Sequence, residues 1–509
     1  MPRHFRFEAM WTRDHRCGEV IKEAWKAKVF GSPCFKLARK QEVTSVALRK
    51  WNKNEFGLCQ TRIRELSNNI EAIQRKKRIE GNSRMEAKLQ GELNEWMARN
   101  EILWRQKLRE VWLKDGDKNS KIFHLSTIIR RRRNSINSIK GDHGNWITNK
   151  RDIRAFIVDK FQLLFQEEAI DFPQDLENLI SPSLSPGDIT SLCSLPTTLE
   201  IKDTFFVMSD QNALGNDGLP TMFYKRYWAT IGLTVTAAIQ SFFSAGKMLK
   251  EINNTLIVLI PKNSSPSTVN HFRPISLCNT VYKAILKLLV ARVRPVLNKL
   301  ISPCQSAFIP GTWIAENPIT VHELLHSFKR RKVKEGFISL KIDIQKAYDH
   351  INWGFLKVVL KNFGFPDIFV NWIMECISTI SFSVLFNGGK SNFFTLTRGL
   401  RQGDPLSPYL FILCQEVLSR IIEREHATSS IQGVKMNVGG PSFTNVMYAD
   451  DIMLFAKASR REVVTLNTCL EKYCDWSGQL INRDKSGVIF SKLVSRESFL
   501  VQKQTTLLK

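Results

Sequence analysis

The stretch "TNVMYADDIMLFA" (444–456) limits the possible folds most, because two apolar runs enclose two adjacent carboxylates, Asp450 and Asp451. Apolar runs on both sides of a short polar interruption predict a β-hairpin with the carboxylates at its tight turn. A second stretch, "FISLKID" (337–343), alternates like a strand whose apolar side chains share one face, and its last residue, Asp343, lies on the other face. Two such strands side by side would bring three carboxylates together.

Three neighbouring carboxylates repel one another and raise one another's pKa values, so such a cluster needs bound cations. We expect Mg²⁺, with Mn²⁺ as a substitute, because this ion prefers oxygen ligands and binds through one or two carboxylates plus substrate phosphates. Two ions about 4 Å apart can activate an attacking 3′-hydroxyl and stabilise a leaving pyrophosphate. An adjacent Asp pair is more often a solvated turn former, and the residues alone leave both interpretations open.

The charge balance points to a polyanionic partner. The chain has 74 Lys and Arg against 48 Asp and Glu, a net charge of +26, which favours nucleic acid or an anionic membrane surface. No run of about 18 apolar residues occurs, and the N-terminal "MPRHFRFEAMWTRDHRC" has charges where a secretory signal needs its apolar core. We therefore expect a soluble, intracellular protein without a membrane segment, whose ten scattered cysteines are reduced and structural.

The first part of the chain has a helical pattern. Apolar residues recur at helical spacing from about Arg62 to Trp112 and are interrupted at "EGNSR" (80–84). This pattern predicts a helical hairpin or a short coiled coil with a charged outer face. We assign residues 1–125 to a mostly helical N-terminal region.

A basic segment follows, "IIRRRRNSI" (128–136), and its clustered side chains are Arg130, Arg131, Arg132 and Arg133. The cluster is either a phosphate-contacting patch that binds nucleic acid or a solvated charge run, and both interpretations stay open. The next stretch, "SINSIKGDHGNWIT" (135–148), predicts two short strands around a turn, and the Ser- and Pro-rich "SPSLSPGD" (181–188) predicts a linker. Residues 126–195 are therefore assigned to a basic connector and linker.

Beyond residue 195 the pattern becomes mixed. The stretches "NTLIVLIPK" (254–262) and "SFSVLFNG" (381–388) predict strands, as "FISLKID" does. Between them, "NWGFLKVVLKNFG" (352–364) predicts a helix with one apolar face. The order lacks the regular βαβ repetition of a doubly wound sheet, so the expected fold class is α+β.

Several motifs in sequence order resemble the reverse transcriptases of LINE-type (non-LTR) retrotransposons found in plants. "YADD" (448–451) resembles the Tyr-x-Asp-Asp box of this family, and "LKIDIQKAYD" (340–349) resembles the segment that carries its first catalytic Asp. Further matching segments are "WLKDGDKNSKIFH" (112–124), "LIPK" (259–262), "HFRPISLCN" (271–279), "LISPCQSAFIPG" (300–311) and "RGLRQGDPLSPYLF" (398–411). The resemblance implies an RNA-directed DNA polymerase with a right-hand architecture, in which residues 196–335 form the fingers and residues 336–509 form a palm with an antiparallel sheet.

The same resemblance implies roles for single residues. Asp343, Asp450 and Asp451 would be the metal-binding triad, with Asp343 and Asp450 as bridging ligands. Lys485, in "INRDKSG", matches a lysine that protonates the leaving pyrophosphate, although an ordinary surface lysine explains it almost as well. Asp349 precedes a helix, and we expect it to serve near the N-cap.

Five further residues match nucleotide-binding positions of the family. Lys262 and Arg273 would grip the triphosphate, and their charges suit that role. Tyr348 matches an aromatic steric gate that excludes a 2′-hydroxyl, with a core tyrosine as the alternative. Gln402 and Gly403 match a contact to nucleotide and template, where glycine lets the backbone approach closely.

The stretch "VHELLH" offers a different class of function. His322, Glu323 and His326 have the H-E-x-x-H spacing of zinc metalloproteases, which places two imidazoles on one helical face with Glu as general base. The following "SFKRRKVKEG" supplies no matching third ligand, so we rank this hypothesis far below the polymerase.

Some features depart from the family pattern. Thr312 stands where Arg is usual and Asn216 where Pro is usual, and the chain ends at Lys509, before the expected thumb. No endonuclease, RNase H segment or Cys-His knuckle is visible, so an endonuclease would act from a separate chain. The expected partners are an RNA template, a DNA primer or nicked target DNA, and deoxynucleoside triphosphates, in the nucleus or cytoplasm with the nucleus favoured by the resemblance. The alternative is a catalytically inactive relic that only binds nucleic acid.

Overall fold

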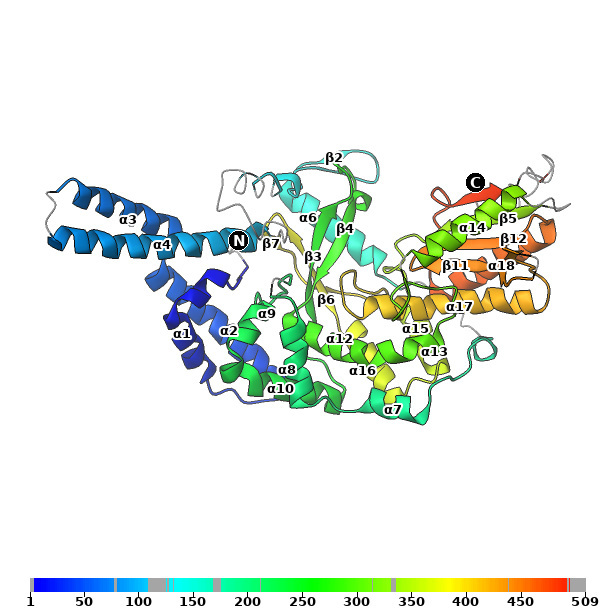
Figure 1. Cartoon of the computed structure of the whole chain (residues 1–509), viewed down its shortest axis with the longest axis horizontal. Coiled ribbons are helices and arrows are strands. Elements are labelled where there is room, and N and C mark those ends of the chain that lie inside the picture. The colour runs from blue at the N-terminus through cyan, green and yellow to red at the C-terminus, as the bar shows by residue number, and fades with distance from the viewer. Residues whose placement is uncertain are drawn as a thin grey trace. The chain divides into compact units, whose positions relative to one another are not determined.

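The computed structural model describes residues 4–76, 80–108, 125, 128–130, 132–167, 175–210, 212–313, 315–330, 336–437, 439–491 and 494. The chain divides into two compact units that each combine separate segments. The first unit contains Met1–Val158, Pro196–Ala284 and Ser381–Phe393, and the second contains Asp159–Leu195, Ile285–Ile380 and Phe394–Lys509. Their helices and strands are drawn in Figure 1, and the mixture of both confirms the α+β fold class.

The first unit begins with helices. They are η1 (Ala9–Arg13), α1 (His15–Trp25), α2 (Pro33–Trp51), α3 (Cys59–Gln74) and α4 (Glu80–Leu108). Helices α3 and α4 lie side by side in Figure 1 and pack through Leu66, Ile70 and Leu93, which confirms the predicted helical hairpin. The stretch "EGNSR" is the first part of α4 rather than a break, because none of its residues stops a helix as proline would.

The remaining helices of the first unit precede its main strands. They are α8 (Thr198–Val207), α9 (Thr221–Arg226), α10 (Trp228–Ala245) and α11 (Lys250–Asn253). Helix α10 is the most apolar of these and ends at Gly246, whose φ of 63° makes the left-handed turn that often closes a helix. It packs against α2 and α8, so the N-terminal helices and this segment share one core.

The main sheet of the first unit contains β4 (Phe272–Leu277), β3 (Asn254–Pro261), β6 (Ser381–Phe386) and β7 (Gly389–Lys390), in that order. Strand β3 pairs with β4 antiparallel and with β6 parallel. The strands expected in "NTLIVLIPK" and "SFSVLFNG" are therefore confirmed. Strand β3 has neighbours on both sides, which is consistent with its nearly continuous apolar sequence.

A small hairpin lies in the same unit. Strands β1 (Ile139–Lys140) and β2 (Trp146–Ile147) pair antiparallel, which confirms the two short strands expected there. The backbone N–H of Lys140 donates to the carbonyl of Ser267 in the loop between β3 and β4, at 2.7 Å. Arg130, Arg132 and Arg133 precede this hairpin and are exposed, whereas Arg131 and the stretch 112–124 lie outside the described residues.

The central sheet of the second unit contains β11 (Asn445–Tyr448), β12 (Asp451–Lys457), β5 (Phe337–Asp343) and β13 (Gly487–Phe490), in that order and antiparallel throughout. This arrangement confirms the predicted strand and hairpin. Figure 1 shows helices on both sides of these strands. Helix α14 (Glu316–Arg330) packs on one face through Leu324 and Phe328, which contact a cluster that contains Phe337 and Phe455.

The opposite face carries Ile342 and Ile452, which lie against α17 (Ser407–Ala427) and α18 (Arg460–Ser477). Helix α15 (Trp353–Asn362) packs against both, as its predicted apolar face requires, and α16 (Asp367–Ser378) follows it. Further elements among the described residues are α6 (Lys150–Leu164), α12 (Thr280–Val293), α13 (Leu297–Leu300), β8 (Phe394–Thr395), β9 (Val434–Lys435) and β10 (Ser442–Phe443). No helix among the described residues is both long and apolar enough to cross a membrane.

The predicted linker is partly helical. Within "SPSLSPGD", Ser185 caps α7 (Pro186–Cys193): its hydroxyl accepts from the Asp188 N–H, and the Asp188 carboxylate accepts from the Ser185 N–H. Ser-x-x-Asp with proline at the first helical position is a helix start signal, although the same residue types also occur in linkers. The linker prediction was therefore wrong for its second half.

Candidate active site

Three carboxylates meet at one end of the central sheet of the second unit. Asp451, the first residue of β12, lies directly opposite Asp343, the last residue of β5. Residues opposite each other on antiparallel strands have Cβ atoms about 5 Å apart and point to the same face. Asp450 precedes Asp451 and forms the hairpin turn together with Ala449, since Tyr448 and Asp451 are the closing pair. The sheet register thus brings Asp343 to the adjacent pair Asp450 and Asp451, which lies more than a hundred positions later in sequence.

The electrostatics of this cluster follow from its crowding. The pKa of Asp450 is raised above its usual value, first because the surrounding chain desolvates the carboxylate and then because Asp451 and Asp343 repel its charge. This desolvation acts even though Asp450 retains an exposed surface. Burial also raises the pKa of Tyr348 to about 12, and the negative charge of Asp450 adds to the shift. Without a cation, the cluster therefore disfavours its own fully ionised form.

The backbone of Asp343 is held by the turn that carries Lys485. The Asp343 N–H donates to the Ser486 hydroxyl at 3.0 Å, and its carbonyl accepts from the Asn482 N–H at 2.8 Å. Lys485 itself is exposed, and its N–H donates to the Asn482 carbonyl at 3.2 Å. The structure therefore places Lys485 on the segment next to the first carboxylate.

Tyr348 lies between the carboxylates and the segment 398–411. Its carbonyl accepts from the Leu400 N–H at 2.6 Å, and its ring stacks on Phe411 of α17 with 5.0 Å between centroids. Nearby, Gly399 has a φ of 92°, and a side chain there would meet the Asp349 carbonyl at 2.6 Å, so only glycine fits. Tyr348 is thus neither a free surface residue nor fully buried in the core.

Gln402 and Gly403 form the turn that leads into α17. Gly403 has a φ of 97° and is exposed, and Gln402 is half-buried. The turn is closed by Asp404, whose carboxylate accepts from the N–H groups of Leu406 and Ser407 at 2.7 and 3.2 Å. Gln402 and Gly403 therefore lie in the second unit, on a loop whose junction with α17 is held by the Asp404 hydrogen bonds.

The expectation for Asp349 was wrong. The cap of α15 is Asn352, whose side chain accepts from the Phe355 N–H at 3.0 Å. Asp349 is buried three residues earlier, in a turn where its N–H donates to the Lys346 carbonyl at 2.7 Å. Both Asp and Asn are good caps, and only the position of the first helical turn distinguishes them.

The predicted triphosphate ligands belong to the first unit. Lys262 follows β3, and its ammonium donates to the Asn270 carbonyl at 2.9 Å within the loop between β3 and β4. Arg273 is exposed on β4, opposite Ile260 of β3. These residues therefore share one end of the β3–β4 pair, and their role with a nucleotide stays a prediction.

The donor chemistry of the three aspartates fits Mg²⁺. Within the described parts of the chain, no three His, Cys, Asp or Glu side chains form a ready-made ligand set. This also holds for His322, Glu323 and His326 on α14, for which no third zinc ligand is found among those residues. Mg²⁺ keeps waters and substrate phosphates as ligands and needs only one or two carboxylates, so a closed protein cage is not required.

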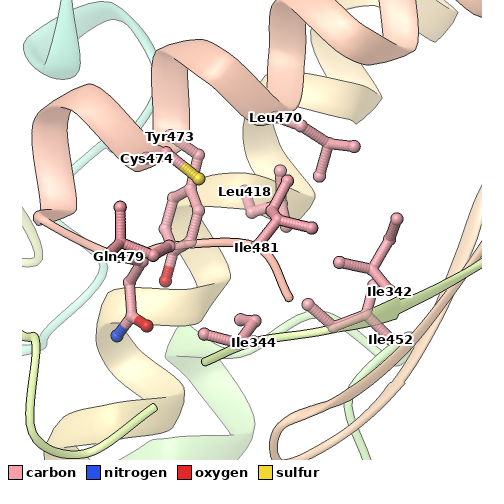
Figure 2. A pocket seen from close by; sticks show the side chains of 10 residues that line it. Ile342, Ile344, Leu418, Ile452, Leu470, Tyr473, Cys474, Gln479 and Ile481 are labelled. Carbon is pink, nitrogen blue, oxygen red and sulfur yellow. The ribbon is translucent and has the colours of Figure 1, made fainter. Parts of the chain in front are cut away.

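The face of the sheet behind the carboxylates is apolar. Figure 2 shows a small pocket whose lining includes Ile342 and Ile452, each next to an aspartate in sequence. Leu470 and Tyr473 of α18 close it from the other side. Its lining contains no charged side chain, so this pocket suits packing behind the strands rather than binding of a charged substrate.

One residue that holds the carboxylate turn was missed by the sequence analysis. Gln305, in "LISPCQSAFIPG", is buried, and its side chain accepts from the Ala449 N–H at 3.1 Å. The only signal in the sequence was a polar residue inside a segment that resembles the polymerase family, which does not identify its partner.

Comparison with known proteins supports the polymerase assignment. Residues 260–506 match the family model described as reverse transcriptase (RNA-dependent DNA polymerase). An uncharacterized 149 kDa protein of transposon TX1 from Xenopus laevis is 26% identical over 374 residues, which cover 73% of this chain and 28% of that protein. A retrovirus-related Pol polyprotein from a type-2 retrotransposable element of Drosophila melanogaster is 25% identical over 351 residues, 67% of this chain and 32% of that protein.

A shorter match is closer in sequence. An uncharacterized mitochondrial protein of Arabidopsis thaliana is 46% identical over 67 residues, which cover 13% of this chain and 55% of that protein. The matches to the transposon and retrotransposon proteins are longer, yet they span only 28% and 32% of those proteins. Residues 260–506 thus match a reverse transcriptase domain, and the two longer relatives are proteins of a transposon and of a retrotransposable element.

Proposed function

We propose that this chain is an active RNA-directed DNA polymerase of a plant LINE-type element, which extends a DNA 3′ end along an RNA template by two-metal nucleotidyl transfer. The observation that carries the proposal is the register that sets Asp451 opposite Asp343 and leaves Asp450 at the adjoining turn. Three carboxylates at one strand end have a raised energy unless cations neutralise them, and phosphoryl transfer supplies both the cations and a reason for them.

In the proposed reaction the primer 3′-hydroxyl loses its proton to solvent, its oxygen bonds to the α-phosphorus of the nucleotide, and the bond from that phosphorus to pyrophosphate breaks. Asp343, Asp450 and Asp451 would together hold two Mg²⁺ ions. When bound, Mg²⁺ supplies charge that favours the 3′-alkoxide and the departing pyrophosphate. Lys485 would give a proton to that leaving group, which its exposed position allows.

Selection of the substrate is assigned to the neighbouring residues. Tyr348, stacked on Phe411, would lie against the sugar and exclude a 2′-hydroxyl, which selects deoxynucleotides. Gln402 and Gly403 would contact the nucleotide and template. Lys262 and Arg273 would bind the triphosphate through charge-assisted hydrogen bonds.

The nucleic acids and the location complete the proposal. The template is RNA, and the primer is DNA, including the nicked target DNA on which such elements initiate, with the nick made by a separate endonuclease in the nucleus. Arg130, Arg132 and Arg133 are exposed and would contact phosphates, as Arg131 would by the sequence alone. The net charge of +26 supports a polyanionic partner.

Primer extension tests the proposal directly. Purified protein is incubated with a poly(rA) template, an oligo(dT) primer, dTTP and Mg²⁺, beside a variant with Asp450→Ala and Asp451→Ala. We expect incorporation by the native chain and none by the variant, while both bind RNA with the same salt dependence. RNA binding by a folded native chain without incorporation would contradict the proposal and favour the inactive relic.

A further inference from the structure

The hairpin turn that carries Asp450 is held from outside its own strands by a buried amide. Gln305 is 3% exposed, and its side-chain oxygen accepts from two backbone N–H groups, that of Ala449 at 3.1 Å and that of Ala307 at 2.9 Å. Ala449 is the residue immediately before Asp450. A single side-chain oxygen therefore ties the turn to the segment that contains Gln305.

The amide also contacts a second buried glutamine, and the two backbone N–H groups determine which way it faces. The Gln305 NH₂ group donates to the side-chain oxygen of Gln415 on α17 at 3.1 Å, and Gln415 is fully buried. Two backbone N–H groups require an acceptor, so the Gln305 oxygen must face Ala449 and its NH₂ group must face Gln415. The NH₂ group of Gln415 has no hydrogen-bond partner among the described residues. Among those residues, the Gln415 amide is therefore held only by its bond from Gln305.

The neighbouring backbone reinforces the same attachment. The Met447 N–H donates to the Cys304 carbonyl at 2.7 Å, and the Ser306 N–H donates to the Met447 carbonyl at 3.3 Å, which makes a parallel bridge beside β11. The Asn317 side chain also donates to the Met447 carbonyl. The strand before the turn is thus bound on its outer edge by the segment around Gln305.

The turn itself needs such support. Ala449 has a φ of 51°, in the left-handed region that residues with a Cβ atom rarely adopt. A conformation of this kind persists when surrounding contacts over-determine it, and it often occurs at functional sites. The hydrogen bond from the Ala449 N–H to Gln305 is a contact at this residue itself.

We propose that Gln305 is a positioning residue for the polymerase reaction: through the Ala449 N–H it sets the place of the Asp450 carboxylate relative to Asp343 and Asp451. This inference rests on the proposed function. Gln305 touches neither the nucleotide nor a reacting atom, and it acts only by fixing the turn. Its role is therefore in metal affinity and turnover rather than in substrate binding.

The chain offers a matched control. Glu462 is also buried, and its carboxylate likewise accepts from two backbone N–H groups, those of Gln432 and Lys457, both at 3.1 Å. Lys457 ends β12, the strand that Asp451 begins. At about 3.3 Å per residue the two strand ends lie about 20 Å apart. Glu462→Met thus also removes a buried acceptor of two backbone N–H groups, one of them at the far end of the strand that Asp451 begins and so away from the carboxylates.

The experiment compares Gln305→Met with Glu462→Met in the full chain. Melting temperature measures the loss of stability, electron paramagnetic resonance of free Mn²⁺ measures the metal Kd, and primer extension with dTTP measures kcat and KM. We expect both variants to lower the melting temperature, whereas only Gln305→Met weakens Mn²⁺ binding and lowers kcat, each by about tenfold or more, with KM for dTTP changed by less than about threefold. Gln305→Glu, which keeps the acceptor, is expected to restore the Mn²⁺ Kd to within about threefold of the native value.

Equal Mn²⁺ affinity and kcat in Gln305→Met and Glu462→Met would overturn the inference and leave Gln305 with a structural role only. If Gln305→Met does not fold, Gln305→Asn is the replacement, because its shorter side chain keeps a polar amide but withdraws the acceptor from the Ala449 N–H, and an unchanged Mn²⁺ Kd there overturns the inference equally. A native chain that binds Mn²⁺ but incorporates no nucleotide would contradict the proposed function instead, and the Mn²⁺ comparison would still decide the role of Gln305.

Discussion

The acidic end of the β11-β12-β5-β13 sheet and the basic end of the β3–β4 pair carry opposite charges in very different ways. Asp343 and Asp451 lie opposite each other on two paired strands, and the backbone of Asp343 is hydrogen-bonded on both its N–H and carbonyl sides. Arg273 instead points from an exposed position on β4, and the Lys262 ammonium is bonded to its own loop. One region holds its charges in fixed places, and the other presents them to solvent.

This difference indicates what each region can bind. Desolvation, and after it repulsion by Asp451 and Asp343, raises the pKa of Asp450, so the folded state bears an electrostatic cost that a bound cation removes. Exposed cationic side chains cost little in the free protein and lose side-chain freedom only when an anion orders them. The acidic region is therefore suited to metal ions, and the basic region to a flexible phosphate chain.

The largest expected effect breaks the acidic region. Asp450→Asn removes one of the three repelling charges and one proposed metal ligand. We expect incorporation of dTTP to fall by at least about 10³-fold, because metal-borne charge stabilisation is worth several kcal/mol. In metal-free buffer at pH 7 the same variant is expected to have a higher melting temperature than the native chain, because its like-charge repulsion is reduced.

The sign follows from the direction of the pKa shift. The folded-state pKa of Asp450 is raised above 3.8, so its carboxyl favours folding while protonated, and this contribution is lost as pH rises through the window above 3.8. Mg²⁺ should stabilise the native chain and have a smaller effect on Asp450→Asn. A variant that is both inactive and less stable in metal-free buffer would show that Asp450 has a structural role that outweighs the repulsion.

A smaller effect is expected in the basic region. Lys262→Ala and Arg273→Ala each remove one charge from an exposed position, so we expect KM for dTTP to rise by about tenfold, the worth of one charge-assisted hydrogen bond. Melting temperatures should stay within about 2 °C of the native value, because exposed substitutions rarely change stability by much.

Steady-state kinetics beside Lys36→Ala, which removes an exposed lysine from α2, would provide the comparison. A fall in kcat with unchanged KM for either variant would place that residue in the chemical step and remove the contrast between the two regions.

The two regions also differ in how well the sequence anticipates them. The register of Asp343 and Asp451 follows from strand alternation: "FISLKID" and "ADDIMLFA" each have an apolar face that must be buried, and this fixes which carboxylates face each other. The helical hairpin followed from apolar residues at helical spacing, and the strand β3 from a nearly continuous apolar run. Each of these features follows from a local sequence pattern that can bury its apolar side chains in only one secondary structure.

The sequence is a poorer guide where the partner is distant. Nothing in "SPCQSAF" indicates that Gln305 bonds to Ala449, which lies 144 positions later. The start of α7 and the cap of α15 were misplaced because Ser, Pro, Asp and Asn serve both in turns and at helix starts, and tertiary packing selects between them. Hydrogen-bonded support of the site therefore had to come from the structure.

The last expected effect leaves activity unchanged and concerns the stability contribution of a buried carboxylate that has no proposed metal. Glu416 on α17 accepts from the Ser302 N–H and hydroxyl at 3.1 Å and from Arg420 at 2.7 Å. Burial nevertheless raises its pKa from 4.5 to about 7, with the nearby Glu423 adding a small contribution of the same sign. The native chain should therefore lose about 3 kcal/mol of unfolding free energy relative to Glu416→Gln as pH rises from about 4.5 to 7.

Chemical denaturation of both chains at several pH values in this window measures the difference. Saturating Mg²⁺ sharpens the test, because it should abolish the pH-dependent contribution of Asp450 and leave that of Glu416 unchanged. If Mg²⁺ abolished the pH dependence that both Asp450 and Glu416 contribute, the raised pKa values of the two carboxyls would have one shared cause in the second unit. The three aspartates would then not be distinguished as a metal site. If the Glu416 contribution persists while that of Asp450 disappears, the cost of burying negative charge is general in this unit, and its relief by a cation is specific to the three aspartates.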